Sequence, residues 1–328
     1  MAVVTRYVNT GSTAGGDGTT NNTTGVTRAY ATLSEWEAAE QTNLVSAGDT
    51  HIVYCAGSTA DTTQLVLSGW TCGSGNECTV AQNSSDAHGG SYNTGVYRLE
   101  HSGSSLNAVD GYETYFKFID LQIKNTNTGG GNPFILFLDA NNEVQRCVLQ
   151  STTNTHSGIA FSNDCTFTDT TIEAIDGSGS RGAYRRSAGR TGVNFVNCTF
   201  DGYYYNCEGE SGVTVTNVAC IDRGTGGTDF QGTFNASSDY NCSEDTSAPG
   251  TNSIKSQTGT SLFTDPANSD FSLKTGSNAI DAGTTSALTT SDIIGTARPQ
   301  NSVYDIGAFE NISAGGGTIL PLLNAYYG

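Results

Sequence analysis

A short stretch of the chain gathers side chains that could act on a carbohydrate. Tyrosine rings offer flat apolar faces for a sugar ring, and two carboxylates at a suitable separation can serve as general acid and nucleophile in glycoside hydrolysis. The candidate catalytic residues are Asp201, Glu208 and Glu210, and the candidate glycan-binding residues beside them are Tyr203, Tyr204, Tyr205 and Asp222. The alternative is a solvated loop of an acidic protein, in which carboxylates occur by chance.

Four arginines form a second candidate binding element just before this stretch. The glycine- and serine-rich segment 177–192 holds four of the chain's fourteen basic residues, namely Arg181, Arg185, Arg186 and Arg190. Because arginine binds carboxylates through two parallel hydrogen bonds, the cluster could clamp an acidic glycan or a neighbouring subunit. The alternative is a loop that neutralises its own acidic surroundings, such as Glu173 and Asp176.

No metal or cofactor site is expected. The four histidines are scattered, and none has the spacing of a metal ligand or of a partner to a nucleophile. Cys72 and Cys78 flank a five-residue loop that they could close as a disulfide under oxidising conditions. Cys147, Cys198, Cys220 and Cys242 are predicted to be small buried hydrophobic residues.

A repeated six-residue motif indicates the elements that must position these residues. It reads apolar, any, Asp or Asn, apolar, any, apolar, with Arg146 in place of the acid or amide in one copy. The copies start at Phe118, Val144, Phe167, Phe195, Val215 and Ser237, at intervals of 20 to 28 residues. Such an interval suits three short strands and three turns, so the motif predicts one coil of a parallel β-solenoid.

The third position of the motif is predicted to form a corner. The first and fourth positions would point to opposite faces of one flat strand, so the chain must bend between them. Asp and Asn tolerate left-handed backbone angles better than other non-glycine residues. The predicted corner column is Asp120, Asp169, Asn197, Asn217 and Asp239. An antiparallel sandwich is the competing fold, but it has no reason to repeat a corner.

Composition supports a single elongated all-β domain. The chain has 328 residues, 36% of them hydrophobic, with 41 glycines and only five prolines. Its net charge of −18 makes nucleic acid or an anionic membrane an improbable partner, because the long-range electrostatic interaction would be repulsive. The beginning of the chain lacks an apolar leader and no run is long enough to span a membrane, so synthesis in a cytosol without membrane insertion is expected.

Both ends of the chain carry a resemblance. The segments Arg6-Tyr7-Val8-Asn9, Ala29-Tyr30-Ala31-Thr32-Leu33 and 48–54 flank a predicted helix around Ser34 to Glu40, with Ser34 and Glu37 as a capping box. They resemble the N-terminal cap of the right-handed parallel β-helix proteins of the pectate-lyase-like superfamily. The segment 262–310, with Ala279-Ile280-Asp281-Ala282-Gly283, Arg298-Pro299 and Asp305-Ile306-Gly307-Ala308-Phe309-Glu310, is similar to the C-terminal module of many bacterial and phage β-helix proteins.

This resemblance implies a single-stranded right-handed parallel β-helix in four parts. They are a cap at 1–48, the β-helix at 49–261, a capping module at 262–310, and a glycine hinge with an apolar tail at 311–328. Arg298 is expected to be an internal ion-pair partner, with Asp281, Asp305 and Glu310 structural. The superfamily includes pectin-degrading enzymes, phage tailspike depolymerases and structural proteins, and the polygalacturonase-like signatures Asn-Thr-Asp, Gly-His-Gly and Arg-Ile-Lys do not occur here.

The tail is predicted to be an assembly arm. It is too short to span a membrane and too apolar to be left in water. Docking on another chain is expected, and folding back on its own β-helix is the alternative. Its large apolar side chains are Ile319, Leu320, Leu322, Leu323, Tyr326 and Tyr327.

Three functions remain open from the sequence. The leading hypothesis is a non-enzymatic bacteriophage virion protein, a fibre, spike or capsid decoration, that forms homo-oligomers, contacts other virion proteins and binds a surface polysaccharide. The first alternative is a carbohydrate-active β-helix enzyme, a lyase or glycosidase. The second is a subunit of an extracellular self-assembling filament.

Overall fold

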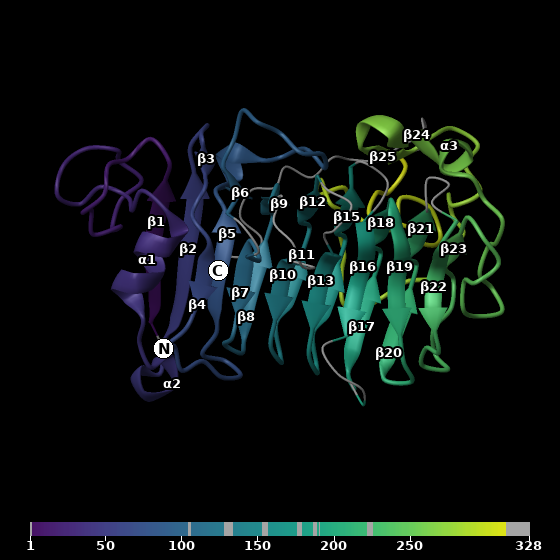
Figure 1. Cartoon of the computed structure of the whole chain (residues 1–328), viewed down its shortest axis with the longest axis horizontal. Coiled ribbons are helices and arrows are strands. Elements are labelled where there is room, and N and C mark those ends of the chain that lie inside the picture. Colours follow the sequence, from purple (N-terminus) through teal and green to yellow (C-terminus); the bar gives the residue numbers. More distant parts are fainter. Residues whose placement is uncertain are drawn as a thin grey trace.

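Three parallel sheets wind around one long core. The computed structural model describes residues 2–103, 106–127, 134–152, 157–175, 179–185, 189, 191–221 and 226–312. From residue 50 to residue 232, successive strands join sheet 1, sheet 2 and sheet 3 in turn, so each of these coils contributes one strand to each sheet. The coils stack in sequence order along the long axis of the molecule (Figure 1). The chain is therefore a right-handed parallel β-helix, as predicted, and not a sandwich.

The strands are short, as a coil with three corners requires. Sheet 1 contains β1 (Val3–Asn9), β2 (Thr50–Ala56), β5 (Cys78–Gln82), β8 (Phe116–Ile119), β11 (Glu143–Gln145), β14 (Thr166–Thr168), β17 (Val193–Val196) and β20 (Val213–Thr216). Sheet 2 contains β3 (Ala60–Asp61), β6 (Arg98–His101), β9 (Gln122–Asn125), β12 (Val148–Ser151), β15 (Thr171–Ala174), β18 (Thr199–Asp201), β21 (Ala219–Ile221) and β23 (Cys242–Ser243). Sheet 3 contains β4 (Leu65–Leu67), β7 (Val109–Gly111), β10 (Phe134–Leu138), β13 (Ser157–Phe161), β16 (Gly179–Arg185), β19 (Tyr203–Gly209) and β22 (Thr228–Gly232).

The remaining elements lie at the ends of the β-helix or in its loops. The helices are α1 (Leu33–Glu40), α2 (Leu44–Ala47) and α3 (Gly259–Leu262), with single 3-10 turns η1 (Ser84–Asp86) and η2 (Pro266–Asn268). The strands β24 (Phe263–Asp265) and β25 (Asp270–Leu273) form an antiparallel pair. None of the helices in the described ranges is long and apolar enough to cross a membrane.

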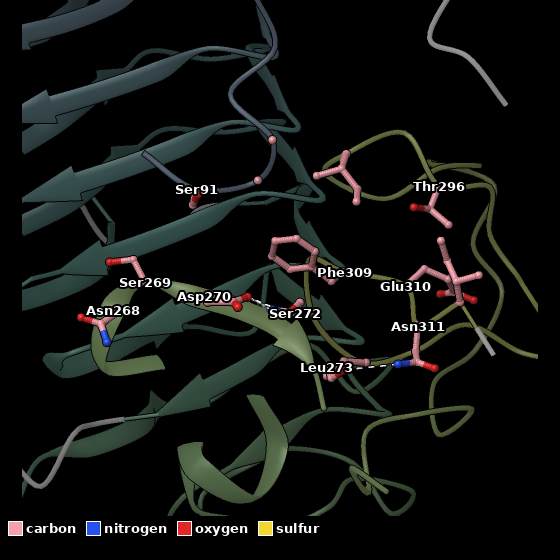
Figure 2. A pocket seen from close by; sticks show the side chains of 14 residues that line it. Ser91, Asn268, Ser269, Asp270, Ser272, Leu273, Thr296, Phe309, Glu310 and Asn311 are labelled. Carbon is pink, nitrogen blue, oxygen red and sulfur yellow. Dashed lines mark hydrogen bonds between the residues drawn. The ribbon is translucent and has the colours of Figure 1, made fainter. Parts of the chain in front are cut away.

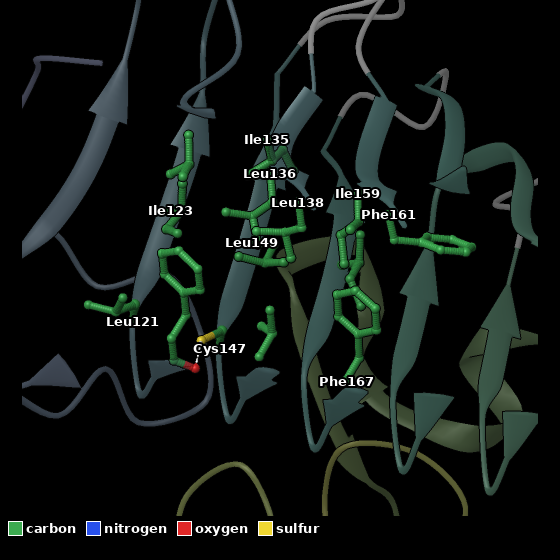
Figure 3. Close-up of a cluster of buried hydrophobic side chains, with 14 of the residues drawn as sticks. Leu121, Ile123, Ile135, Leu136, Leu138, Cys147, Leu149, Ile159, Phe161 and Phe167 are labelled. Atoms are coloured by element: carbon green, nitrogen blue, oxygen red, sulfur yellow. Dashed lines mark hydrogen bonds between the residues drawn. The ribbon is translucent and has the colours of Figure 1, made fainter. Parts of the chain in front are cut away.

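The apolar positions of the motif stack into columns inside the β-helix. At the first position Phe118, Val144 and Phe167 are in register through β8, β11 and β14, and Phe195 and Val215 continue the column. The sixth position forms a second column in sheet 2. Figure 3 shows Ile123, Leu149 and Phe167 among the buried side chains of these coils. The stacking of like residues thus explains why the motif repeats.

The corner column between sheets 1 and 2 is confirmed for four of its five predicted members. Asp120, Asp169, Asn197 and Asn217 have φ between 50° and 57°, in the left-handed region. Asn217 Nδ2 donates to Asn197 Oδ1 at 2.8 Å, and Asn197 Nδ2 donates to Asp169 Oδ1 at 3.2 Å. The amides therefore bond from coil to coil along the corner.

Two details of this corner differ from the sequence prediction. Asp239 is wrong as the last member, because it pairs in register with Thr216 and the left-handed residue is Tyr240, with φ of 58°. The final motif copy is therefore displaced by one residue. Arg146 occupies the corner with φ of 50° and bonds Asp120 through Nε at 2.6 Å and Nη2 at 3.0 Å. Its guanidinium thus replaces the amide as the coil-to-coil donor.

The N-terminal cap covers the first coil with α1. The predicted helix is present as α1, but it begins at Leu33: Thr32 Oγ1 accepts from Glu35 N at 3.1 Å, so Thr32 and not Ser34 is the N-cap. Glu37 is buried instead and accepts from Ser68 N at 2.9 Å. The Glu37 side chain is therefore held by the backbone of Ser68 in the first coil. Local capping rules do not include such a contact.

Acid is expected to loosen this cap through His51. The Trp36 indole donates to His51 Nε2 at 3.1 Å, and burial lowers the pKa of His51 to about 4 from 6.5. Because the folded-state pKa lies below the unfolded value, this contribution to stability is present above pH 6.5 and is lost as pH falls towards 4. The only two tryptophans, Trp36 of the cap and Trp70 of the first coil, have rings 5.5 Å apart, so their fluorescence reports on the contact between cap and coil. We expect a lower urea midpoint at pH 5 than at pH 7.5.

The matched variant is His51→Gln, which keeps a hydrogen-bond acceptor but does not titrate. Its fluorescence midpoint should change much less between the two pH values. An equal change in both proteins would show that another group governs the acid response of the cap.

The C-terminal module packs along the outside of the corner column. Arg298 Nε lies 3.1 Å from Asp169 Oδ1 and its Nη1 lies 2.8 Å from Glu310 Oε2, with all three side chains essentially buried. Arg298 Nη2 also donates to Gly307 O at 2.9 Å. The predicted internal ion pair of Arg298 is confirmed, and its partner Asp169 ties the module to the β-helix. Burial raises the pKa of Asp169 to about 6.

All nine cysteines are free thiols. Cys147, Cys198, Cys220 and Cys242 are buried in the core, as predicted. Cys72 and Cys78 are also free, and burial raises the pKa of Cys72 to about 12. A thiol with so high a pKa forms little thiolate and reacts slowly.

Candidate functional site: the outer face of sheet 3

The two candidate elements found in the sequence lie side by side on sheet 3. Strand β16 carries Arg181 and Arg185, and β19 carries the tyrosines and Glu208; the two strands are hydrogen-bonded neighbours with Arg181 paired to Tyr205. Coil stacking brings together residues that are more than twenty positions apart in the chain. Arg186, Arg190 and Asp222 lie outside the described residues.

The arginines are paired with the candidate catalytic acids. Arg181 Nε is 3.3 Å from Glu208 Oε2, and Arg185 Nε is 3.6 Å from Glu208 Oε1. Arg185 Nη1 lies 2.8 Å from Glu210 Oε2, which also accepts from Gly189 N at 3.0 Å. These four side chains form what we call the charged patch. Arg181 and Arg185 therefore pair with acids of the neighbouring coil, Glu208 and Glu210, and not with Glu173. Glu173 is buried in sheet 2, where it accepts hydrogen bonds from Ser269 and Gln150.

Two predicted site residues are in the wrong place to meet a glycan. Asp201 and Tyr203 are fully buried. Asp201 ends β18 and Tyr203 starts β19, so both flank the corner where the chain turns from sheet 2 to sheet 3. Tyr204, by contrast, is 44% exposed and its ring contacts that of Tyr205 at a centroid distance of 4.7 Å. Of the three predicted tyrosines, only Tyr204 and Tyr205 reach the surface.

Aromatic residues that the sequence analysis missed extend this surface across the sheet. Phe137, Ala160 and Tyr184 are in register through β10, β13 and β16. The rings of Phe134 and Tyr184 stack at 5.8 Å with an interplanar angle of 13°, although strand β13 lies between their strands. Tyr112 contacts Phe137 at 5.7 Å and is 54% exposed. We call Tyr112, Phe134, Phe137 and Tyr184 the aromatic stripe.

The stripe and the charged patch are continuous. The Arg181 guanidinium lies 4.6 Å from the ring centroid of Tyr184, within cation–π range, while also facing Glu208. The surface runs across the strands from β7 to β19, about 19 Å at the usual strand spacing. Aromatic faces with a few oriented charged groups are what a polar ligand with apolar faces needs for binding.

The carboxyl of Asp229 has a pKa suited to general acid–base catalysis, but it is buried and a ligand cannot reach it. Burial raises the pKa of Asp229 to about 7. Its Oδ1 accepts from Asn206 Nδ2 at 2.7 Å and its Oδ2 from Glu244 N at 2.6 Å, and the residue is 1% exposed. Asp229 is the second residue of β22, and these contacts tie it to Asn206 of β19 and to the segment that follows β23. No group of three or more His, Cys, Asp or Glu side chains suited to a metal ion occurs in the described part of the chain.

The class of the protein follows from the sheets and not from sequence relatives. It is a right-handed parallel β-helix with a polar and aromatic outer face on sheet 3. No protein-family model matches the chain, and no curated protein matches it. Among solved structures it is similar to a crystal structure of pectate lyase Pel9A, with 12% identity and a TM-score of 0.41 over 94% of this chain and 96% of that one. A likeness at this level carries no argument about activity.

Proposed function

We propose that this β-helix is a non-enzymatic binding protein for a surface polysaccharide, and that sheet 3 is its binding face. The observation that carries the proposal is the continuous surface of the aromatic stripe and the charged patch. Rings such as Tyr112 and Phe137 remain partly in water although a β-helix can place polar residues there. Exposed aromatic clusters beside charged groups are typical of ligand surfaces and not of solvated faces.

The pairing of the acids supports binding without turnover. Glycoside hydrolysis requires one carboxyl to donate a proton and another to attack or activate water across the scissile bond. Glu208 and Glu210 instead share Arg185, at 3.6 and 2.8 Å. A guanidinium between two carboxylates occupies oxygens that this mechanism would need. The same pairs preorganise hydrogen-bonding groups for sugar hydroxyls.

A structural role in a bacteriophage particle is the setting that we propose for this binding. Free buried cysteines suit assembly in a reducing cytosol. The N-terminal cap covers apolar core that an open solenoid would expose. We accordingly propose a fibre, spike or capsid decoration that forms homo-oligomers and contacts other virion proteins. Co-purification with intact particles tests this part, and a protein found only in the particle-free fraction would contradict it.

Removing a ring of the stripe is expected to weaken binding. Tyr184→Ala should lower the affinity for a bound acidic or neutral polysaccharide about tenfold, because it deletes the ring that stacks on Phe134 and underlies Arg181. Affinity electrophoresis across a polysaccharide panel measures the change. Tyr54→Ala is the control, since Tyr54 is a half-buried tyrosine of sheet 1. Equal weakening by both variants would place the ligand elsewhere.

Turnover assays separate binding from catalysis. Reducing-end and unsaturated-product assays on the bound polysaccharide are expected to detect no product. If product forms and Glu208→Gln abolishes it while circular dichroism is unchanged, the protein is a carbohydrate-active enzyme and the non-enzymatic assignment is wrong.

A further inference from the structure

The outer face of sheet 1 holds a large groove that the proposed function does not use. Its volume is about 950 Å³, and it runs beside the strands from β1 to β14. The loop 82–89 and the segment 287–295 of the C-terminal module also line it. Apolar side chains on the floor and walls include Tyr7, Ile52, Tyr54, Ile119, Leu288 and Ile294.

The groove suits an uncharged apolar ligand. Leu288 is 49% and Ile294 is 40% exposed, so the wall leaves large apolar side chains in water. Lys117 lies 3.0 Å from Glu77 and 3.5 Å from Glu143, and Arg146 is bonded to Asp120, so the charges along the floor are paired with one another. An apolar segment would bury the exposed side chains without breaking an ion pair.

The described chain ends in a cavity that adjoins this groove. A smaller cavity of about 510 Å³ is lined by Ile312 together with Gly89, Gly90, Ile294 and Phe309 (Figure 2), and Gly89 and Ile294 also line the groove. A Cβ on Gly90 would lie 2.6 Å from the Phe309 ring, so glycine allows the loop to meet the module there. Asn311 Nδ2 donates to Leu273 O at 3.2 Å, which fixes the point from which the tail leaves.

We propose that the tail 313–328 binds in the sheet 1 groove of its own chain. The segment has no charged side chain and carries six large apolar ones after a glycine hinge. Its 16 residues can span about 50 Å when extended, whereas six neighbouring strands of sheet 1 cover about 24 Å. A hinge that starts beside the groove gives the tail a high effective concentration there, which favours its own chain over a neighbour. Docking on another chain, expected from the sequence alone, is the competing outcome.

Cross-linking in the full-length chain tests the proposal directly. A variant with Ile119→Cys and Leu323→Cys, oxidised under mild conditions, should form a disulfide within one chain, seen as a faster-migrating monomer on a non-reducing gel. Each single substitution serves as a control for the native thiols. Disulfide-linked dimers would show that the tail docks on a second copy, and absence of both products would show that it does not lie in the groove; either result overturns the proposal.

Proteolysis of the tail gives a second readout that does not require engineered thiols. Chymotrypsin cleaves after leucine and tyrosine, and groove binding should slow cleavage of the tail. Leu288→Arg places a charge on an exposed groove residue and should speed tail cleavage about tenfold. Thr214→Arg, on sheet 1 beyond the groove, should leave the rate unchanged. Equal rates in the wild type and both variants contradict the proposal.

Discussion

Arg298→Ala is expected to lower the free energy of unfolding by about 3 to 5 kcal/mol, the usual cost of leaving buried charges without their partner. Arg298 is the cation between Asp169 of the corner column and Glu310 of the module. Its removal leaves both carboxylates buried and unneutralised. The loss should appear first as release of the module, measured by limited proteolysis, and as a lower urea midpoint by circular dichroism.

The pH dependence identifies the cause of this loss. Burial raises the pKa of Asp169 to about 6, so the carboxyl is largely protonated in the folded protein at pH 5 and carries less charge to be left unpaired. The destabilisation by Arg298→Ala should therefore be smaller at pH 5 than at pH 8. Arg181→Ala is the matched control, because its ion pair is one-third exposed and should contribute at most about 1 kcal/mol. If Arg298→Ala lowered the free energy of unfolding by no more than Arg181→Ala does, the role assigned to Arg298 would be wrong.

Phe195→Ala is expected to cost about 3 to 5 kcal/mol as well, through a cavity in the middle of the β-helix. The Phe195 ring is fully buried and stacks on Phe167 at 4.5 Å with an interplanar angle of 8°. It also makes edge contacts with Phe161 at 5.6 Å and Phe200 at 5.7 Å. Each coil of a solenoid is held only by its neighbours. A void at Phe195 therefore weakens the contact between the coils on either side of it.

Chemical denaturation distinguishes this core effect from a general loss of aromatic contacts. Tyr204→Ala removes an exposed ring on β19, in the same coil as Phe195 but outside the core stack, and should change the free energy of unfolding by less than about 0.5 kcal/mol. Phe195→Ala should also broaden the unfolding transition as coils on the two sides separate. A cost near that of Tyr204→Ala would mean that neighbouring coils collapse into the space.

Several parts of the fold could be predicted because they follow local rules. The pairing of Asp or Asn with a chain bend gave the corner at Asp120, Asp169, Asn197 and Asn217, since left-handed φ values depend mainly on the residue itself. The one-residue error at Asp239 arose in the last coil, where Ser237 weakens the apolar pattern that sets the register.

The aromatic stripe could not be found from the sequence. Phe134-Ile135-Leu136-Phe137-Leu138 reads as a continuous apolar run, which does not indicate which side chains point outward. The corners of the coil decide this, and they place Ile135, Leu136 and Leu138 inside (Figure 3). For the same reason Tyr203 and Tyr204, adjacent in the chain, end in the core and on the surface.

The sequence by itself determined the solenoid, its corner residues, the buried cysteines and the internal role of Arg298, because each depends on a residue type or on a short repeat. Only the tertiary structure decided which residues share the outer face of sheet 3. Contacts across coils, such as Arg185 with Glu208 and Phe134 with Tyr184, join residues far apart in sequence at distances set by strand stacking. The partner of Arg298 was decided in the same way, since Asp169 reaches it across 129 positions of the chain.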